Sequence, residues 1–263
     1  MRVNGRTNMA GGEASAGAHV PRPMSLTRLI LLHLFPGALA TALFVVTAQP
    51  FQDAGYPPVM GLMLGIVVVI VPWELGVVLL AGRGSAQGGA LAAIPIQHRL
   101  TAREWLVFVP ALLVVAVLGF GLLSLLETPI RDAAFGWLPD WYREIISIDS
   151  VSDYANSAWI VTLSVYAMLN VFVGPAVEEL YFRGYLMPRM SQMGKWAPFV
   201  NVVLFSLYHF WAPWGFLSRI AGVTPFAYAV WWKRNVYLGM AVHILLNGIG
   251  TASLIAMVAG KLS

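Results

Sequence analysis

The feature that most constrains this chain is a series of apolar runs. Several are close to the roughly 20 residues that a helix needs to cross a hydrocarbon core of about 30 Å. The 263 residues are 59% hydrophobic and only 11% charged. Because a backbone in lipid finds no water to hydrogen-bond, such runs are predicted to form helices. We therefore expect an all-α, polytopic integral membrane protein.

The apolar runs predict seven transmembrane helices, near residues 29–48, 59–81, 105–126, 157–177, 197–211, 215–232 and 236–258. The fifth and sixth are short and are associated with Pro213 and Pro225, which is typical of a broken or re-entrant element. An eighth helix would lie there or within 82–104. Residues 28–263 are expected to form a single transmembrane domain.

Residues 1–27 have a different composition from the rest of the chain. They are rich in Gly, Ala and Ser and carry Arg2, Arg6 and Arg22, which predicts a disordered basic tail. The first apolar run begins only near Leu29, too far along for a cleavable signal peptide. The chain has no cysteine, which excludes disulfides, CxxC zinc sites and thiol catalysis. The net charge of +4 is small and indicates no nucleic-acid partner.

Loop charges predict the orientation. Basic residues precede the first helix and follow the second, fourth and sixth, whereas the 127–156 segment is mainly acidic. With seven helices, the four basic segments share one side, and the positive-inside rule places that side and the N-terminus in the cytoplasm. The protein is therefore expected in the plasma (inner) membrane. The basic residues after these helices are Arg83, Arg99, Arg103, Arg183, Arg189, Lys195, Lys233 and Arg234.

Ionisable residues inside membrane helices face the protein interior and mark function by default. The stretch "GPAVEELYFRGYL" places Glu178 and Glu179 at the end of the fourth predicted helix. If the helix continues, Glu179 and Arg183 share a face and can pair, while Glu178 points about 100° away. The structural alternative is a solvated helix end. Acidic residues at a helix C-terminus oppose the macrodipole, which disfavours that alternative.

Two further polar patterns lie on later helices. "FSLYHF" puts Phe205 and His209 at i and i+4, and "HILLNG" does the same for His243 and Asn247. A single membrane histidine is often only hydrogen-bonded to a carbonyl, but two polar groups on one apolar helix need partners. A carboxylate, two imidazoles and a carboxamide can together activate a water: a general base, groups that orient the water or bind a metal, and an amide for an oxyanion.

These three stretches carry a family resemblance. "EELYFR", "FSLYH" and "HILLN" resemble, in the same order, the EExxxR, FxxxH and HxxxN motifs of the CPBP family. That family contains type II CAAX prenyl endopeptidases and bacterial abortive-infection and bacteriocin-processing proteins. The resemblance covers residues 174–248, within a family-like core expected at 157–258. The HExxH, GxGD and GxSG motifs of other intramembrane proteases do not occur.

The resemblance implies an intramembrane endopeptidase with four catalytic residues. Glu178 would activate the attacking water and His209 would position it. His243 and Asn247 would form the oxyanion site. Three residues would support these groups, namely Glu179, Arg183 and Phe205. The substrate would be a membrane-associated protein or peptide, with the lipid bilayer as the second partner.

The resemblance leaves the metal open. The family is named as metalloproteases, yet its members are also described as glutamate-dependent enzymes without an obligatory metal. Glu178, His209 and His243 are the candidate ligands, and such a set can hold zinc with an open position. No other cofactor is implied.

Two other functions compete with proteolysis. One is an ion-coupled transporter in which the same glutamates and histidines relay ions. The other is a non-catalytic relative that binds a partner, for example in immunity. Glu74 either lines the same cavity or, as we favour, is a helix-kink residue capped by a neighbour, and His33 is interpreted as structural. Arg219 is either a cavity residue or a sign that the sixth helix boundary is wrong.

With the predicted helix boundaries, the catalytic side chains would lie at different depths in the membrane. Glu178 would lie at a helix end, whereas His209 would lie about 20 Å along the fifth helix at about 1.5 Å per residue. Tilted helices, or a fifth helix that starts outside the bilayer, would be needed to join them.

Overall fold

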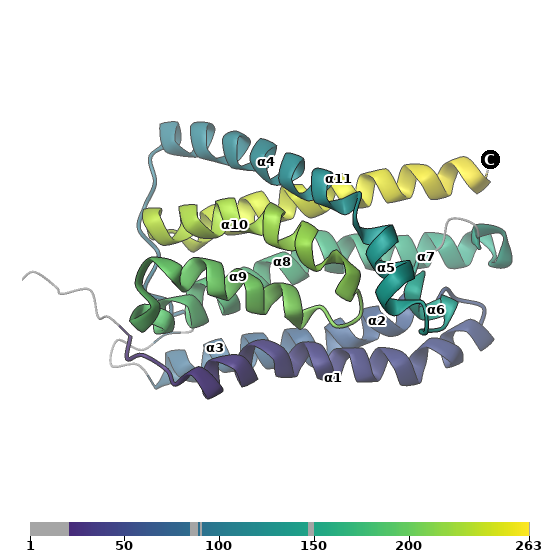
Figure 1. Cartoon of the computed structure of the whole chain (residues 1–263), viewed down its shortest axis with the longest axis horizontal. Coiled ribbons are helices and arrows are strands. Elements are labelled where there is room, and N and C mark those ends of the chain that lie inside the picture. Colours follow the sequence, from purple (N-terminus) through teal and green to yellow (C-terminus); the bar gives the residue numbers. More distant parts are fainter. Residues whose placement is uncertain (1–20, 85–88, 90, 147–149, 263) are drawn as a thin grey trace, which may run out of the picture.

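The computed structural model describes residues 21–84, 89, 91–146 and 150–262, and the long helices in this part of the chain run roughly along one axis (Figure 1). Five helical stretches are long and apolar enough to cross a membrane. They are Leu26–Asp53, Val59–Arg83, Ala102–Ser124, Asn156–Tyr208 and Val236–Lys261. The predicted all-α, polytopic membrane fold is therefore confirmed.

The α-helices, in chain order, are α1 (Leu26–Asp53), α2 (Val59–Gly65), α3 (Val71–Arg83), α4 (Ala102–Ser124), α5 (Glu127–Phe135), α6 (Asp140–Arg143), α7 (Asn156–Ala167), α8 (Gly174–Glu178), α9 (Ala197–Tyr208), α10 (Phe216–Lys233) and α11 (Val236–Leu262). Wider π-helical turns join some of them, at Ile66–Ile70, Met168–Val173 and Glu179–Leu186. Short 3₁₀ turns lie at Val151–Asp153, Met187–Trp196 and Pro213–Gly215.

All seven predicted apolar segments are helical, with one important shift of boundary. The fourth helix does not end near residue 177, because α8 runs directly into the π-helical turn Glu179–Leu186. The described part of 82–104 holds no additional helix between α3 and α4. Length and hydropathy select five spans, and α10 is not one of them. Seven or eight membrane crossings therefore stay a prediction.

The stretch Asn156–Tyr208 is too long to cross a membrane once. Its 53 residues would extend about 80 Å at 1.5 Å per residue, against a hydrocarbon core of about 30 Å. The helical geometry breaks at Met190 and at Gly194, whose φ of 54° lies in the left-handed region that glycine adopts easily. The chain turns there and returns as α9, as the fifth predicted helix requires (Figure 1).

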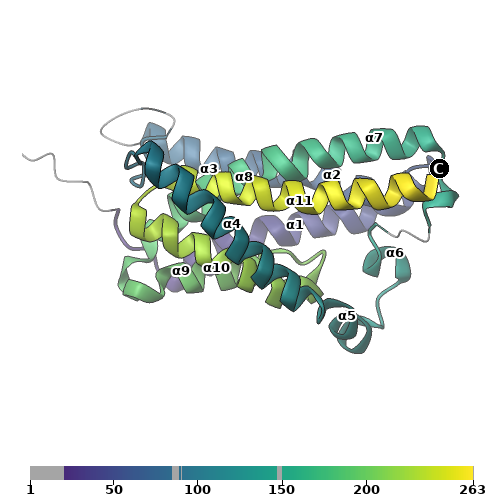
Figure 2. The same ribbon diagram turned by 90° about the horizontal axis from the view of Figure 1, so that it is seen from above.

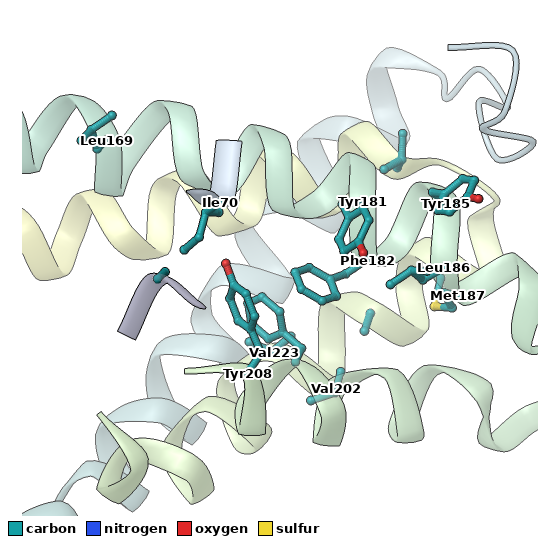
Figure 3. Packing of buried hydrophobic residues seen from close by; sticks show 14 of the residues in the cluster. Ile70, Leu169, Tyr181, Phe182, Tyr185, Leu186, Met187, Val202, Tyr208 and Val223 are labelled. Atoms are coloured by element: carbon teal, nitrogen blue, oxygen red, sulfur yellow. The ribbon is translucent and has the colours of Figure 1, made fainter. Parts of the chain in front are cut away.

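The helices pack around a core of buried aromatic and aliphatic side chains. α10 lies against α4 and α9, α1 lies against α2 and α9, and α11 lies against α4 and α10. Figure 2 shows α4 crossing the bundle obliquely. In Figure 3, Phe182 from the fourth predicted helix packs on Tyr208 of α9, with 5.1 Å between ring centroids. Large apolar residues on α4, such as Leu106 and Leu118, are exposed, as expected for a helix that faces lipid.

The basic segments gather at one end of the bundle. The backbone N–H of Met24 donates to the carbonyl of Arg189 at 3.0 Å, and that of His98 donates to the carbonyl of Arg234 at 2.8 Å. Lys233 forms an ion pair with Glu104 at 2.9 Å. The side of the membrane that this end faces stays a prediction, as does the identity of the membrane.

The predicted basic tail lies largely outside the described residues, which begin at residue 21. Its last two residues are helical, because α1 begins at Leu26. Ser25 caps this helix by accepting a hydrogen bond from the backbone N–H of Arg28 at 3.4 Å.

Candidate active site

A cavity of about 500 Å³ opens between α2, α4, α8, α9, α10 and α11. Most of its lining is apolar, with Leu62, Ile66, Leu169, Phe205 and Leu246 among the contributing side chains. All four predicted catalytic residues border it, namely Glu178, His209, His243 and Asn247. A mostly apolar cavity with a few convergent polar groups is typical of a binding or active site.

Glu178 reaches this cavity from the middle of a long helix. Pro175, at the start of α8, has no backbone N–H to donate, and the helix widens into π-helical turns on both sides of α8. Such turns often occur at functional sites. Because the helix continues to Leu186, Glu178 lies well inside the bundle, as does His209 at the end of α9. The apparent difference in depth came from ending the fourth helix too early.

The predicted pairing of Glu179 with Arg183 is confirmed. Arg183 Nη1 lies 3.1 Å from Glu179 Oε1, and both side chains are 0% exposed. The Arg183 guanidinium also lies over the Phe205 ring, with Cζ 4.1 Å from the ring centroid. Arg183 is therefore not a loop cation, and its inclusion in the loop-charge count was wrong. Phe205, expected to pack the pocket, contacts this cation and borders the cavity.

His243 connects that ion pair to the free glutamate. Its Nδ1 lies 3.0 Å from Glu179 Oε1, and its Nε2 lies 3.9 Å from Glu178 Oε2. An ionised carboxylate only accepts hydrogen bonds, so Nδ1 is the donor and its orientation is fixed. The result is a continuous series of charged and polar groups from Arg183 through Glu179 and His243 to Glu178.

Gly239 makes room for this arrangement one helical turn before His243. A Cβ added at Gly239 would lie 2.6 Å from Glu179 Oε2 and 2.7 Å from Val230 Cγ2. At Gly248, on the same helix, an added Cβ would meet only Val171, at an ordinary distance of 3.6 Å. The absence of a side chain at Gly239 therefore lets the Glu179 carboxylate approach α11.

A Gly239→Ala substitution is expected to displace the Glu179 carboxylate and lower activity by about tenfold or more, since a misplacement of about 1 Å can cost 10²-fold. Gly248→Ala on the same helix is the matched control and should leave activity nearly unchanged. Both variants gain similar helix propensity, so cleavage rates on one peptide substrate isolate the effect of the displaced carboxylate. Equal activity of the two variants would argue against this geometry.

His209 is held at the end of α9. Its Nδ1 lies 2.8 Å from the carbonyl oxygen of Phe205, and its ring packs 4.9 Å from that of Trp211. Since a carbonyl only accepts, Nδ1 donates, and in the neutral ring Nε2 carries the free lone pair. His209 thus has the hydrogen bond to a backbone carbonyl that is expected of a structural histidine. Its position at the cavity is in keeping with a catalytic role as well.

Asn247 is positioned by polar residues that the sequence analysis did not single out. Its Nδ2 donates to the backbone carbonyl of Asn170 at 2.8 Å, and the Asn170 side chain donates to Thr251 Oγ1 at 3.0 Å. One N–H of the Asn247 amide is used in this way and a second remains. Thr251 follows Asn247 at i+4, so helical spacing was the signal that could have identified it.

Two more buried polar residues lie near Glu178. Glu74 is 0% exposed. Tyr208 interacts electrostatically with Glu74 and Glu178. Glu74 therefore belongs to the polar surroundings of Glu178, but it is not among the residues that line the cavity. Its interpretation as a capped kink residue stays a prediction. His33 bonds the Leu29 carbonyl at 2.7 Å, in keeping with a structural role.

The candidate metal ligands do not form a metal site. Within the described residues, no group of three or more His, Asp or Glu side chains could hold a metal ion. The Nδ1 atoms of His209 and His243 face the Phe205 carbonyl and Glu179, so Nε2 is the nitrogen of each ring that could bind a metal. Glu178, His209 and His243 are not gathered as a zinc ligand set in the described residues, and the metalloprotease character, which the sequence left open, is not supported.

Comparison with protein-family models gives a match in the second half of the chain. Residues 160–249 match the family model described as type II CAAX prenyl endopeptidase Rce1-like. No curated protein and no solved structure matches the chain. The matched segment runs from α7 into α11 and contains the three motifs that suggested the family. Residues 160–249 of this chain are therefore a domain of the Rce1-like type II CAAX prenyl endopeptidase (CPBP) family, a family of membrane proteases.

Proposed function

We propose that this protein is a membrane-embedded endopeptidase that cleaves a membrane-associated protein or peptide with a water activated by Glu178. One observation carries the proposal. The Glu178 carboxylate borders an apolar cavity, and His243 is held between it and the buried pair of Glu179 and Arg183. The family match at residues 160–249 supports the same reaction class.

In the proposed reaction, Glu178 takes a proton from a water bound in the cavity, and the water oxygen attacks the carbonyl carbon of the scissile peptide. His209 accepts the second water proton in a hydrogen bond at its free Nε2, which orients the attack. The C–O bond forms and the carbonyl oxygen becomes an oxyanion. Glu178 then returns its proton to the amide nitrogen as the C–N bond breaks.

The oxyanion requires donors. The second Nδ2–H of Asn247 is one, because only the first is used by Asn170. His243 Nε2, which lies 3.9 Å from Glu178 Oε2, is the second donor when it carries a proton. In this account Glu179 and Arg183 act through His243, which they hold in place, and Phe205 packs against Arg183.

Removing metal should leave this reaction intact, because each proposed step uses only protein side chains and a water. Cleavage of a transmembrane peptide library by purified protein in detergent is expected to change less than twofold after EDTA treatment and dialysis. Loss of activity that Zn²⁺ restores would overturn the glutamate-only mechanism. Ion uptake into proteoliposomes without any peptide cleavage would instead support the transporter alternative.

A further inference from the structure

Arg219 is a cation inside the cavity that the proposed reaction does not use. It lies in the first turns of α10 and borders the same cavity as Glu178 and His209. The cavity residues Val117 and Val223 near this region are apolar. Charged side chains within a membrane protein are costly and face functional cavities. The alternative that Arg219 marks a wrong helix boundary is excluded, because α10 runs from Phe216 to Lys233.

The guanidinium is only partly satisfied by the protein. Nη2 donates to the Ala212 carbonyl, and the buried Nε has no hydrogen-bond partner among the described residues. Glu127 and Glu178 interact with Arg219 as charges, and the Glu127 carboxylate accepts a hydrogen bond from Ser218. In the described part of the chain, Arg219 forms no salt bridge. Its charge and donors are therefore available to a ligand.

The backbone leaves space for this group. A Cβ added at Gly215 would lie 2.6 Å from Arg219 Nη1. The guanidinium thus rests directly against the 3₁₀ turn Pro213–Gly215, and the Ala212 carbonyl fixes one of its edges. A planar guanidinium fixed on one side presents a fork that matches a carboxylate bidentately.

We propose that Arg219 determines substrate specificity by binding a carboxylate group of the peptide that occupies the cavity. The inference rests on the proposed peptidase function. A carboxylate is the ligand that neutralises the charge of this guanidinium and, being planar, accepts hydrogen bonds from two of its N–H groups. Two parts of a peptide supply such a group, the free C-terminus and an Asp or Glu side chain, and the experiment separates them.

The test measures binding rather than cleavage. A fluorescein-labelled apolar octapeptide is prepared with a free C-terminus, with a C-terminal amide, and with a C-terminal amide plus one internal Glu. Fluorescence anisotropy in detergent gives the affinity of each probe for wild type, Arg219→Gln and Arg219→Lys. We expect wild type to bind at least one carboxylate probe about tenfold or more tightly than the plain amide. Arg219→Gln should reduce this ratio to about one.

The variants separate charge from geometry. Arg219→Lys should keep part of the preference, because an ammonium is a point charge without the fork. Gly215→Ala should weaken the preference with the charge still present, since the added methyl displaces Nη1. If Arg219→Gln does not fold, Arg219→Lys and Gly215→Ala still carry the test. The free-acid probe and the Glu probe identify the source of the carboxylate.

Equal binding of all three probes by wild type, or an unchanged ratio in Arg219→Gln, would overturn the inference. These outcomes are distinct from failure of the proposed function. Preferential binding without any cleavage would refute the peptidase function and keep the carboxylate site. Cleavage without a binding preference would keep the peptidase function and refute the carboxylate site.

Discussion

A Glu178→Gln variant is expected to lose peptide cleavage by about 10³-fold or more while keeping the wild-type fold. General acid–base catalysis contributes about 10²–10⁴-fold, and in this site one carboxylate both removes the water proton and returns it to the leaving nitrogen. Glutamine has nearly the same shape, so the cavity and KM should change little and the loss should appear in kcat.

Glu144→Gln is the matched control, because Glu144 is exposed and lies outside the cavity. It makes the same change from acid to amide and should leave kcat unaltered. The chain has 10 tryptophans, so thermal unfolding followed by intrinsic fluorescence shows whether both variants are folded. A folded Glu178→Gln variant with more than a tenth of wild-type kcat would exclude Glu178 as the base.

An Arg183→Met variant is expected to be destabilised by about 3–5 kcal/mol, because Glu179 would be left buried without its cation. Both side chains of the pair are 0% exposed, so water cannot take the place of Arg183. At about 2–4 °C per kcal/mol for a chain of this size, Tm should fall by roughly 10 °C. Activity should fall as well, since Glu179 holds His243.

The double variant Glu179→Gln/Arg183→Met separates these two effects. With both charges removed, no unpaired ion remains in the core, and much of the lost stability should return. Activity should stay low, because the Glu179 carboxylate that orients the His243 ring is no longer present. A Tm for Arg183→Met within 2 °C of wild type, or full activity in the double variant, would show that the pair does not organise the site.

The sequence predicted those parts of the structure that depend on local periodicity. Apolar length predicted the helices, and i, i+4 spacing predicted that Glu179 would face Arg183. The same spacing placed His243 and Asn247 on one face of α11, where both border the cavity. Each of these relations lies within a single helix, so it follows from helix geometry alone.

The end of the fourth helix could not be predicted in the same way. A count of apolar residues places the end of the helix at Glu178, Glu179 and Arg183, because these residues are charged. Their burial becomes possible only through contacts with distant segments: Arg183 against Phe205 on α9, and Glu179 against His243 on α11. The count also misassigned Arg183 as a loop charge for the same reason.

Other contributions to the site arise only in three dimensions. Glu74 and Tyr208 come from α3 and α9 and meet near Glu178 without any shared motif. Gly239 matters because the Glu179 carboxylate lies against it. The sequence also could not show whether Glu178, His209 and His243 lie close enough together to bind zinc. Within the described residues, their side chains do not form a group of three metal ligands.

The most direct test of the central claim is mass spectrometry of a library of transmembrane peptides after incubation with purified wild-type protein and, in parallel, with Glu178→Gln. Peptides with new termini are expected to accumulate with wild type and to be absent with the variant. The same products from both proteins, or no products from a wild-type protein shown to be folded, would contradict it.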